Sequence, residues 1–373
     1  MVPLRTVRRP RAALVPAVLA LAAAAVLPAA ASAASPRTVH VRGTAYEFNS
    51  VHTMLAGARI RVAEDPTRSA TVRPDGTYDL TVRAHAQVTP YIQAPGYHTI
   101  DLQTFTTNGA NLENVNFQTP SDAVTAGLSA ILNVSHDAAG YPTKCAIVST
   151  FSTKNVRGVD YQSFIGYGAH GVAGAAAHTS PSLPGPTYFN EHVIPDPLQA
   201  LSSEDGGVVW TEVPAGRYTI SATSPTTRFA SFVATCKPGR IVNANPPWGL
   251  HELATTVPTG VSAHWAASRT RAPRLRSLTV AKPPAHATIT VRCGGRRCFR
   301  TTTDDGSATF SLDVRHALGA AAGRLKAGKT LDVTVAAPAF NAKVVSWRIP
   351  RRGTPRAVVR CIPLGDSLPQ KRC

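Results

Sequence analysis

Short runs of alternating apolar and polar residues dominate the chain from Val39 to Phe117. The runs cover residues 58–62, 78–82 and 99–102. Alternation with a period of two is typical of a strand that has one face in a core and the other in solvent. Turn-forming residues separate the runs at 74–76 and 94–96. We therefore predict a β-sandwich over residues 34–119.

One segment instead has the spacing of a helix. Its apolar residues, which fall on one helical face, are Val124, Leu128, Ile131 and Leu132. Before them, Thr119 is the predicted N-cap, Pro120 opens the first turn, and Asp122 lies three residues after the cap. The pattern predicts a linking helix over residues 120–133, with its apolar stripe packed against a neighbouring element.

Strand-like patterns return in residues 134–258. The predicted strands include residues 208–213, 216–220 and 229–236. Before them, residues 152–203 are rich in Gly, Tyr, His and Pro and have no steady period. We predict a second β-sandwich with a long insertion at 152–203.

The last part of the chain is basic. We predict a linker at 259–277, followed by a C-terminal β-module at 278–373 that contains a short helix at 316–325. Its predicted strands are 287–291, 308–312 and 331–335. Gly 27 and Pro 30 suit short strands joined by many turns. The predicted fold class is thus all-β, with two or three consecutive β-sandwich modules and a short linking helix.

The first 33 residues have the features of a signal peptide. Four arginines precede an uncharged apolar run at 12–31, and Ala31, Ser32 and Ala33 are the small residues that precede a cleavage site. Nothing later in the chain has enough consecutive apolar residues to span a bilayer. We predict a secreted, extracellular protein without a transmembrane segment in its mature chain.

Six cysteines agree with an oxidising compartment. They are Cys145, Cys236, Cys293, Cys298, Cys361 and Cys373. Six cysteines allow 15 pairings, but Cys145 and Cys236 share one segment, and we predict that they pair. Cys293 and Cys298 can close a short local loop, leaving Cys361 with Cys373. A four-cysteine zinc site is the alternative for the last four, although the paired short spacing of such sites is missing.

Several turn-and-strand patterns resemble a known module. Residues 57–62, 75–78 and 94–97 resemble the carboxypeptidase regulatory-like domain, also called transthyretin-like or prealbumin-like, and residues 205–218 are similar to its second half. The final module, with its Cys-Gly-Gly-Arg-Arg-Cys sequence, resembles β-modules of secreted actinobacterial proteins. The resemblance covers most of the mature chain. It implies sandwiches that accompany enzymes or adhesins and usually carry no catalytic residues themselves.

The sequence lacks the common catalytic motifs. No histidine is followed by glutamate at the His-x-x-Glu spacing of a zinc carboxypeptidase, and residue 255, where His-Glu-x-x-His would need a histidine, is threonine. The Gly-x-Ser-x-Gly elbow, the P-loop and the dinucleotide fingerprint are missing too. We predict a protein that is not an enzyme, with no cofactor and no metal site.

The insertion nevertheless carries side chains with possible chemistry. Glu191 beside His192 has the composition of a general base, and His170 and His178 could join them around a metal. The simpler interpretation, which we favour, is a solvated loop. Aromatic residues of the insertion could stack on sugar rings or form the core of the loop. They are Tyr161, Phe164, Tyr167, Tyr188 and Phe189. Tyr161, Tyr167, Tyr188, Phe189 and His192 are therefore binding candidates.

Charge is distributed very unevenly. Residues 34–268 contain 14 Lys/Arg and 16 Asp/Glu, whereas residues 269–373 contain 21 Lys/Arg and 5 Asp/Glu. A surplus of 16 positive charges indicates an anionic partner. The further binding candidates are Arg296, Arg297, Arg300, Arg351 and Arg352. Outside a cell, the expected partner is an anionic wall polymer or glycan rather than a specific nucleic acid.

These observations together predict a secreted, non-catalytic β-module protein that binds polymers of the cell envelope. Two alternatives remain. An enzyme with its site in 152–203 requires His170, His178, Glu191 and His192 to converge, and a protein–protein adhesin would use sheet edges or loops. A glycan binder, in contrast, predicts an exposed shelf of two or three parallel aromatic rings.

Overall fold

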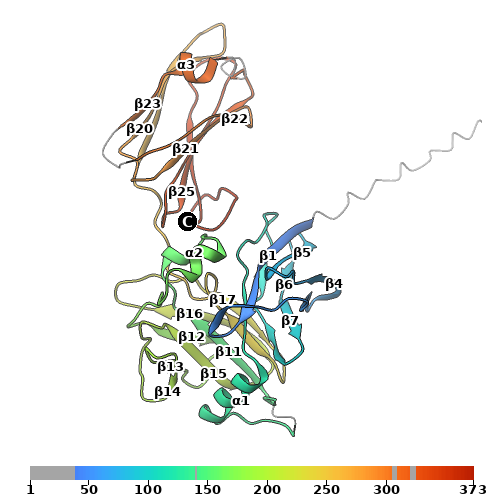
Figure 1. Cartoon of the computed structure of the whole chain (residues 1–373). Coiled ribbons are helices and arrows are strands. Elements are labelled where there is room, and N and C mark those ends of the chain that lie inside the picture. The colour runs from blue at the N-terminus through green and yellow to red at the C-terminus, as the bar shows by residue number, and fades with distance from the viewer. Residues whose placement is uncertain (1–37, 139–140, 305–308, 320–324) are drawn as a thin grey trace, which may run out of the picture. The chain divides into compact units, whose positions relative to one another are not determined.

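The computed structural model describes residues 38–138, 141–304, 309–319 and 325–373 (Figure 1). The structure is 48% strand and 7% helix, which confirms the all-β prediction. The predicted signal peptide lies outside the described residues. Among the described residues, no helix has the length and apolar character needed to cross a membrane.

The N-terminal segment forms strands where alternation predicts them. Its strands are β1 (Thr38–Glu47), β2 (Ser50–Met54), β3 (Arg59–Val62), β4 (Asp65–Thr71), β5 (Thr77–Arg83), β6 (Gln87–Val88), β7 (Pro90–Ala94), β8 (Tyr97–Asp101), β9 (Phe105–Thr106) and β10 (Phe117–Thr119). β1 pairs with β2, β5 and β10, while β6 pairs with β9. The inward positions of β3 and β5, including Ile60 and Leu80, are buried in one core. The alternation of apolar and polar residues thus predicts correctly which face of these strands is buried.

The middle segment adds two further sets of strands. They are β11 (Cys145–Thr150), β12 (Ala176–Ser180), β13 (Thr187–Phe189), β14 (Pro195–Asp196), β15 (Gly207–Val213), β16 (Gly216–Thr223), β17 (Phe232–Cys236) and β18 (Ile241–Ala244). β12, β16 and β17 form a three-stranded sheet. Cys145 on β11 and Cys236 on β17 are joined by the predicted disulfide, which clamps this sheet to β11 across a buried core.

A nine-stranded sheet contains strands from both the N-terminal and the middle segment. Its order is β14-β13-β15-β11-β18-β8-β7-β3-β4. The two segments meet where β18 pairs in parallel with β8, placing Ile241 opposite Ile100 and Val242 opposite Asp101. Residues about 140 positions apart in sequence therefore share hydrogen bonds, a pairing that local patterns cannot reveal.

Helix α1 (Asp122–Ile131) forms in the region predicted to be helical, but its start differs from the prediction. Thr119 belongs to β10, and Ser121 is the N-cap, with its hydroxyl accepting a hydrogen bond from the Val124 amide. The buried residue on the helix is Thr125, whereas Ile131 is exposed. The predicted apolar stripe of α1 therefore coincides only in part with the face of the helix that is buried.

Gly127 offers a test of how much this helix contributes to stability. It lies in the middle of α1 with no atom near the position of an added Cβ. We expect Gly127→Ala to raise the free energy of unfolding by about 1 kcal/mol, because alanine loses less backbone entropy in a helix. Ser121→Ala, which removes the cap, should lower it by about 1 kcal/mol. Urea denaturation of both variants checks the two signs, and a Ser121→Ala variant as stable as the parent would contradict the assignment of the cap.

The insertion at 152–203 is built from short elements. A 3₁₀ turn, η1 (Lys154–Val156), and a helix, α2 (Tyr161–Ile165), precede β12, β13 and β14. Strands of two to five residues are too short to show a period, which is why the segment looks irregular in sequence. Asp160 caps α2 by accepting a hydrogen bond from the Ser163 amide at 2.8 Å.

The C-terminal segment forms two sheets around a third core. Its elements are β19 (Gly260–Ala266), β20 (Arg274–Ala281), β21 (Thr288–Cys293), β22 (Arg296–Thr302), β23 (Phe310–Leu312), α3 (Val314–Leu318), β24 (Thr330–Ala336), β25 (Ala342–Arg348) and β26 (Ala357–Ile362). β19 pairs with β20 across most of the predicted linker 259–277. That segment is therefore part of a sheet. The predicted helix at 316–325 begins earlier, at Val314, and residues 320–324 lie outside the described residues.

The remaining cysteines form Cys293–Cys298 and Cys361–Cys373. All six cysteines are thus disulfide-bonded, and the prediction of three intrachain bridges is confirmed. The zinc alternative is excluded, because thiolates are needed to ligate zinc.

Candidate functional site

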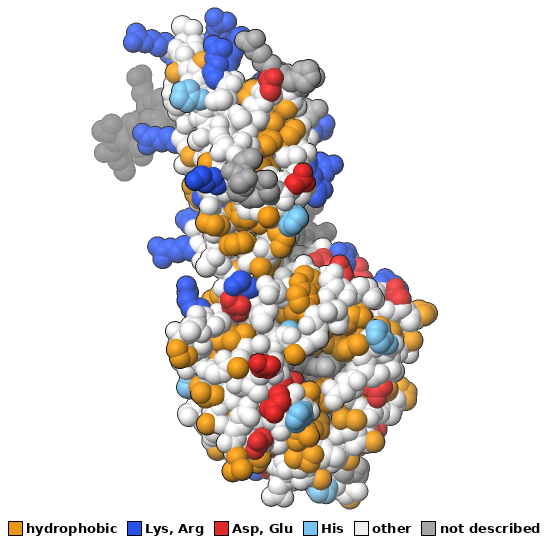
Figure 2. Space-filling model, turned by 60° about the vertical axis from the view of Figure 1, so that its left-hand side comes forward, with side chains coloured by type: hydrophobic (Ala, Val, Ile, Leu, Met, Phe, Trp, Pro, Cys, Tyr) orange, Lys and Arg blue, Asp and Glu red, His pale blue; other side chains and the backbone are white. Residues whose placement is uncertain are grey.

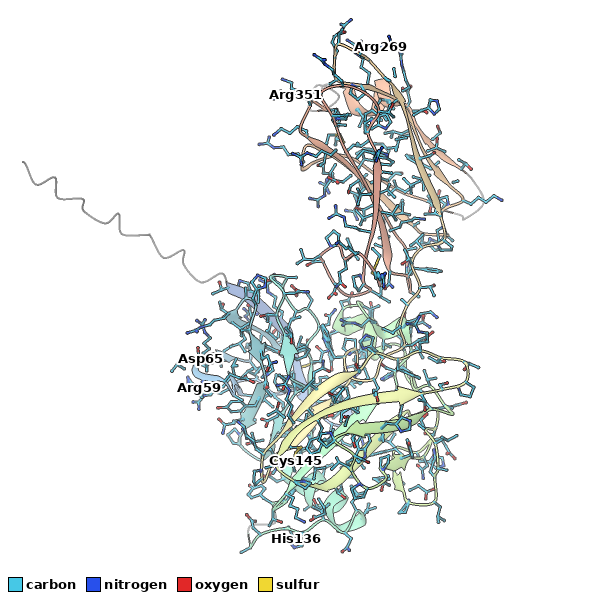
Figure 3. The ribbon with its side chains drawn as sticks, turned by 180° about the vertical axis from the view of Figure 1, so that it is seen from behind. Arg59, Asp65, His136, Cys145, Arg269 and Arg351 are labelled. Carbon is cyan, nitrogen blue, oxygen red and sulfur yellow. A yellow bond between two sulfur atoms is a disulfide. The ribbon has the colours of Figure 1, made fainter. Side chains whose placement is uncertain are left out.

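Four connections meet at one end of the C-terminal sheets. We call them the basic end: residues 267–274, 294–297, 326–329 and 348–356. Strand register brings them together, because Thr330 lies opposite Arg348 and Cys293 opposite Leu331. The Gly294 amide donates to the Thr330 carbonyl at 2.8 Å, and the Gly353 amide donates to the Ser268 carbonyl at 3.3 Å. Figure 3 shows Arg269 and Arg351 at this same end.

The basic end carries a high density of one charge. Its four connections contain eleven Lys and Arg residues and no Asp or Glu. All eleven are exposed. They are Arg269, Arg271, Arg274, Arg296, Arg297, Lys326, Lys329, Arg348, Arg351, Arg352 and Arg356. Lys and Arg side chains are conspicuous on the C-terminal segment in Figure 2. Like charges held this close create a positive potential that attracts anions.

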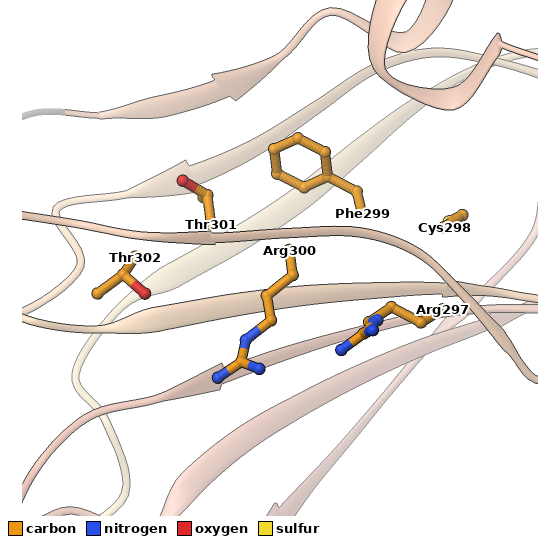
Figure 4. A pocket seen from close by; sticks show the side chains of 6 residues that line it. All are labelled: Arg297, Cys298, Phe299, Arg300, Thr301 and Thr302. Atoms are coloured by element: carbon orange, nitrogen blue, oxygen red, sulfur yellow. The ribbon is translucent and has the colours of Figure 1, made fainter.

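A bulge extends the positive surface along β21 and β22. Val291 lies opposite Phe299 and Arg292 opposite Arg297, so Cys298 has no partner in the ladder. The extra residue brings Arg297 and Arg300 to the same side of the strand. Figure 4 shows their guanidinium groups directed away from Phe299, which packs against the core. A hollow of about 540 Å³ lies along Arg297–Thr302.

The structure thus places all five predicted basic residues on the C-terminal segment as two adjoining groups. Arg296, Arg297, Arg351 and Arg352 belong to the basic end, and Arg300 continues it along β22. From the sequence, the surplus of charge could be predicted but not its location. The location depends on which connections share one end of the sheets, and only the strand register determines that.

The four side chains of the predicted enzymatic site do not gather in one pocket. His170 and Glu191 line a cleft of about 490 Å³. His178 lies on β12, where its Nε2 is 2.9 Å from the Thr223 hydroxyl. The His192 Nε2 is 3.7 Å from the Glu191 carboxylate, and both side chains are largely exposed. Among the described residues, no group of three or more His, Cys, Asp or Glu is placed to hold a metal ion.

The candidate aromatic residues do not form an exposed shelf. The Tyr161 hydroxyl donates to the Val51 carbonyl at 2.6 Å, and its ring lies 5.0 Å from that of Tyr46. Burial raises the pKa of Tyr161 above its ordinary value. Tyr188 is buried and accepts a hydrogen bond from the Ala177 amide, whereas Tyr167 is 47% exposed. Tyr161 and Tyr188 therefore pack the insertion against neighbouring strands, Tyr161 against the β1–β2 hairpin and Tyr188 in the core of the middle segment.

Several residues of the cleft have no signal in the sequence. Its floor includes the amide side chains of Gln118, Asn243 and Asn245. Asn243 lies within β18 and Asn245 directly follows it, whereas Gln118, on β10, is more than 120 positions away in sequence. The sequence offers one signal for the two asparagines: polar and apolar residues alternate at the end of β18, which places the two amides two residues apart.

Comparisons with known proteins find solved structures of low similarity, but no family. No family model and no curated protein matches the chain. A cohesin–X-dockerin complex from Acetivibrio cellulolyticus aligns with 27% of this chain and 78% of that chain, at 17% identity and a TM-score of 0.20. The Bacillus anthracis TIE protein aligns at 14% identity over 85% of this chain and 49% of that chain, with a TM-score of 0.18. A streptococcal ancillary pilin aligns at 9% identity over 86% and 95%, with a TM-score of 0.18. The carboxypeptidase regulatory-like resemblance therefore stays a prediction.

Proposed function

We propose that the chain is an extracellular, non-catalytic binding protein whose basic end attaches it to an anionic polymer of the cell envelope. The observation that carries the proposal is the convergence of eleven exposed Lys and Arg residues, with no Asp or Glu, on the four connections of the basic end. Three disulfides support an oxidising, extracellular location.

Arginine suits such a partner, because its planar guanidinium group forms paired hydrogen bonds with phosphate or carboxylate oxygens. Nine of the eleven basic residues are arginines. They lie on connections rather than in one pocket, so they can contact successive charged groups of an extended chain. The ligand class is therefore a phosphate- or carboxylate-bearing polymer rather than a single small anion.

The test is binding of the full-length chain to purified bacterial cell wall, before and after removal of its phosphodiester-linked polymers. We expect Arg296→Gln, Arg297→Gln, Arg351→Gln and Arg352→Gln together to weaken binding roughly 1,000-fold at low salt, since each charge near an anionic surface contributes about 1 kcal/mol before screening and every 1.4 kcal/mol or so is tenfold in affinity. The slope of log affinity against log salt concentration should fall by about one per lost contact.

A matched control removes the same number of charges elsewhere. Arg59, Arg228, Lys371 and Arg372 are exposed residues outside the basic end, and their replacement by Gln changes the net charge equally. We expect this control to bind within about threefold of the parent chain. Equal losses in both variants would show that net charge alone attracts the polymer and would overturn the proposed site. Binding that ignores salt would overturn it as well.

A further inference from the structure

The cleft of about 490 Å³ is enclosed by segments that are distant in sequence. Two of its walls come from the β1–β2 hairpin and from the insertion, the latter through residues within 164–170 and 189–193. Tyr161 ties the two walls together through its hydrogen bond to Val51 and its ring contact with Tyr46. The volume falls within the range of about 300–1,000 Å³ that is typical of small-molecule sites.

The floor of the cleft holds a buried hydrogen-bond acceptor without a partner. Asn243 is 5% exposed, and its Nδ2 donates to the Gln118 backbone carbonyl at 2.8 Å. This bond fixes the amide and leaves its Oδ1 with no hydrogen-bond partner among the described residues. Beside it, the Asn245 Nδ2 donates to the Gln118 side-chain oxygen. A buried acceptor left unpaired costs about 1–3 kcal/mol, so the position favours a ligand that brings an O–H or N–H donor.

The charged groups of the cleft have one sign. Glu191, Glu204 and Asp205 line it, and no Lys or Arg does. Asp205 is oriented by the Gly207 amide, which donates to its carboxylate at 3.0 Å, and burial raises the pKa of Asp205 above its ordinary value. The His170 Nδ1 donates to the Gly168 carbonyl at 2.7 Å. The cleft is therefore rich in acceptors and disfavours an anion, the opposite of the basic end.

Apolar side chains supply the rest of the surface. Phe48, Phe189 and Val193 are among the residues that line the cleft. Val193 has a φ of 63°, a conformation that is strained for a β-branched residue. The Asn190 side chain holds this turn by accepting hydrogen bonds from the His192 and Ile194 amides at 3.0 and 3.2 Å. Strain held by such a network is characteristic of ligand-binding turns.

We propose that this cleft binds a neutral saccharide. A sugar ring presents hydroxyl donors at its edge and C–H groups on its faces, which match the acceptors and the apolar side chains that line the cleft. An N-acetylated sugar adds an N–H donor for the Asn243 Oδ1. The absence of Lys and Arg among the lining residues excludes a phosphate or carboxylate as the preferred group. The site is separate from the basic end and does not rest on its proposed function.

The first experiment measures binding of N-acetylglucosamine and glucose oligomers of three to four rings to the full-length chain by calorimetry. We expect Ala169→Trp, which places an indole in the cleft, to weaken binding at least tenfold. Ala173→Trp is the matched control, because Ala173 is also exposed but does not line the cleft, and it should bind as the parent does. The variant with four Gln substitutions in the basic end should bind the oligomers unchanged, which separates this proposal from the wall-attachment function.

Two further readouts define the ligand class. Added salt should have little effect on oligomer affinity, because a neutral ligand forms no ion pair. Preferential binding of a lysine-containing peptide, weakened by added salt and lost in Glu191→Gln with Glu204→Gln, would overturn the proposal in favour of a cationic ligand. The absence of heat with either oligomer at about 10 mM, a concentration tenfold above a Kd of 1 mM, would overturn it too. Equal losses of oligomer affinity in Ala169→Trp and Ala173→Trp would also overturn the proposal.

Discussion

Replacing both Cys145 and Cys236 by alanine should lower the free energy of unfolding by about 4–5 kcal/mol. The bridge joins residues 91 positions apart, and in the chain-entropy model a crosslink that closes so long a loop removes much of the freedom of the unfolded chain. Both half-cystines are buried between β11 and β17, so the substitution also removes contacts from the core. Urea denaturation of the parent and the double variant under oxidising conditions measures the difference.

Cys361 and Cys373 provide the comparison. They lie only 12 positions apart, and their replacement by alanine should cost less, about 3 kcal/mol. A loss as large as that of the Cys145–Cys236 variant would contradict the argument from loop length. Peptide mapping without reduction would report any rearranged pairing in either variant.

Arg240→Met should destabilise the chain by about 3 kcal/mol at pH 8, because it leaves a buried carboxylate without its counter-ion. Asp101 is 1% exposed at the end of β8, and the Arg240 Nη2 lies 3.3 Å from its Oδ1. The guanidinium group also lies 4.9 Å above the ring of Tyr91. Methionine keeps most of the aliphatic length and removes the charge. The measured loss in the free energy of unfolding therefore reports the ion pair between Asp101 and Arg240.

The defect of Arg240→Met should depend on pH with a definite sign. Burial raises the pKa of Asp101 to about 6 even with Arg240 present, and the variant should raise it further. Since the folded pKa lies above the unfolded value of about 3.9, the folded state favours the protonated carboxyl. The penalty is therefore complete above the folded pKa and disappears as the pH falls towards 4.

Asp101→Asn combined with Arg240→Met is the control, because it removes both charges. This double variant should recover most of the lost stability at pH 8 and show little of the pH dependence. A defect of Arg240→Met that has the same size at pH 5 and pH 8 would show that lost packing, rather than an unpaired charge, causes it. Urea denaturation at the two pH values distinguishes these outcomes.

The sequence predicts correctly the elements that local residues specify, and it fails where contacts between distant segments decide the structure. Alternation identifies β3, β5 and β24, because a half-buried strand is specified by its own residues. The cap of α1 was misplaced by two residues, since Thr119 and Ser121 are both good caps and the pairing of β10 with β1 decides between them. The strands at 259–277 were missed because their arginines resemble a solvated linker, although β19 pairs with β20 over seven residues.

The candidate sites show the same limit. The basic residues were identifiable as a surplus of charge, but their convergence depends on four turns at one end of two sheets. The insertion's histidines looked like a possible centre because they are close in sequence, yet β12 and the turn at Asn190 place His178 and His192 in different surroundings. Asn243 gave no signal, because its unpaired oxygen exists only once β18 packs beside β10.

The parallel pairing of β8 with β18 also has a consequence for the order of assembly. During synthesis from the N-terminus, β3, β4, β7 and β8 are complete about 140 residues before β18 exists, so β8 must wait as an open edge. Open edges invite pairing with other chains, and natural proteins discourage this with charges that face inward. Asp101 stands at the end of β8, and while it is hydrated its carboxylate is ionised at neutral pH. Before β18 is made, Asp101 therefore places a charge on the unpaired edge of β8, where a charge disfavours pairing with another chain.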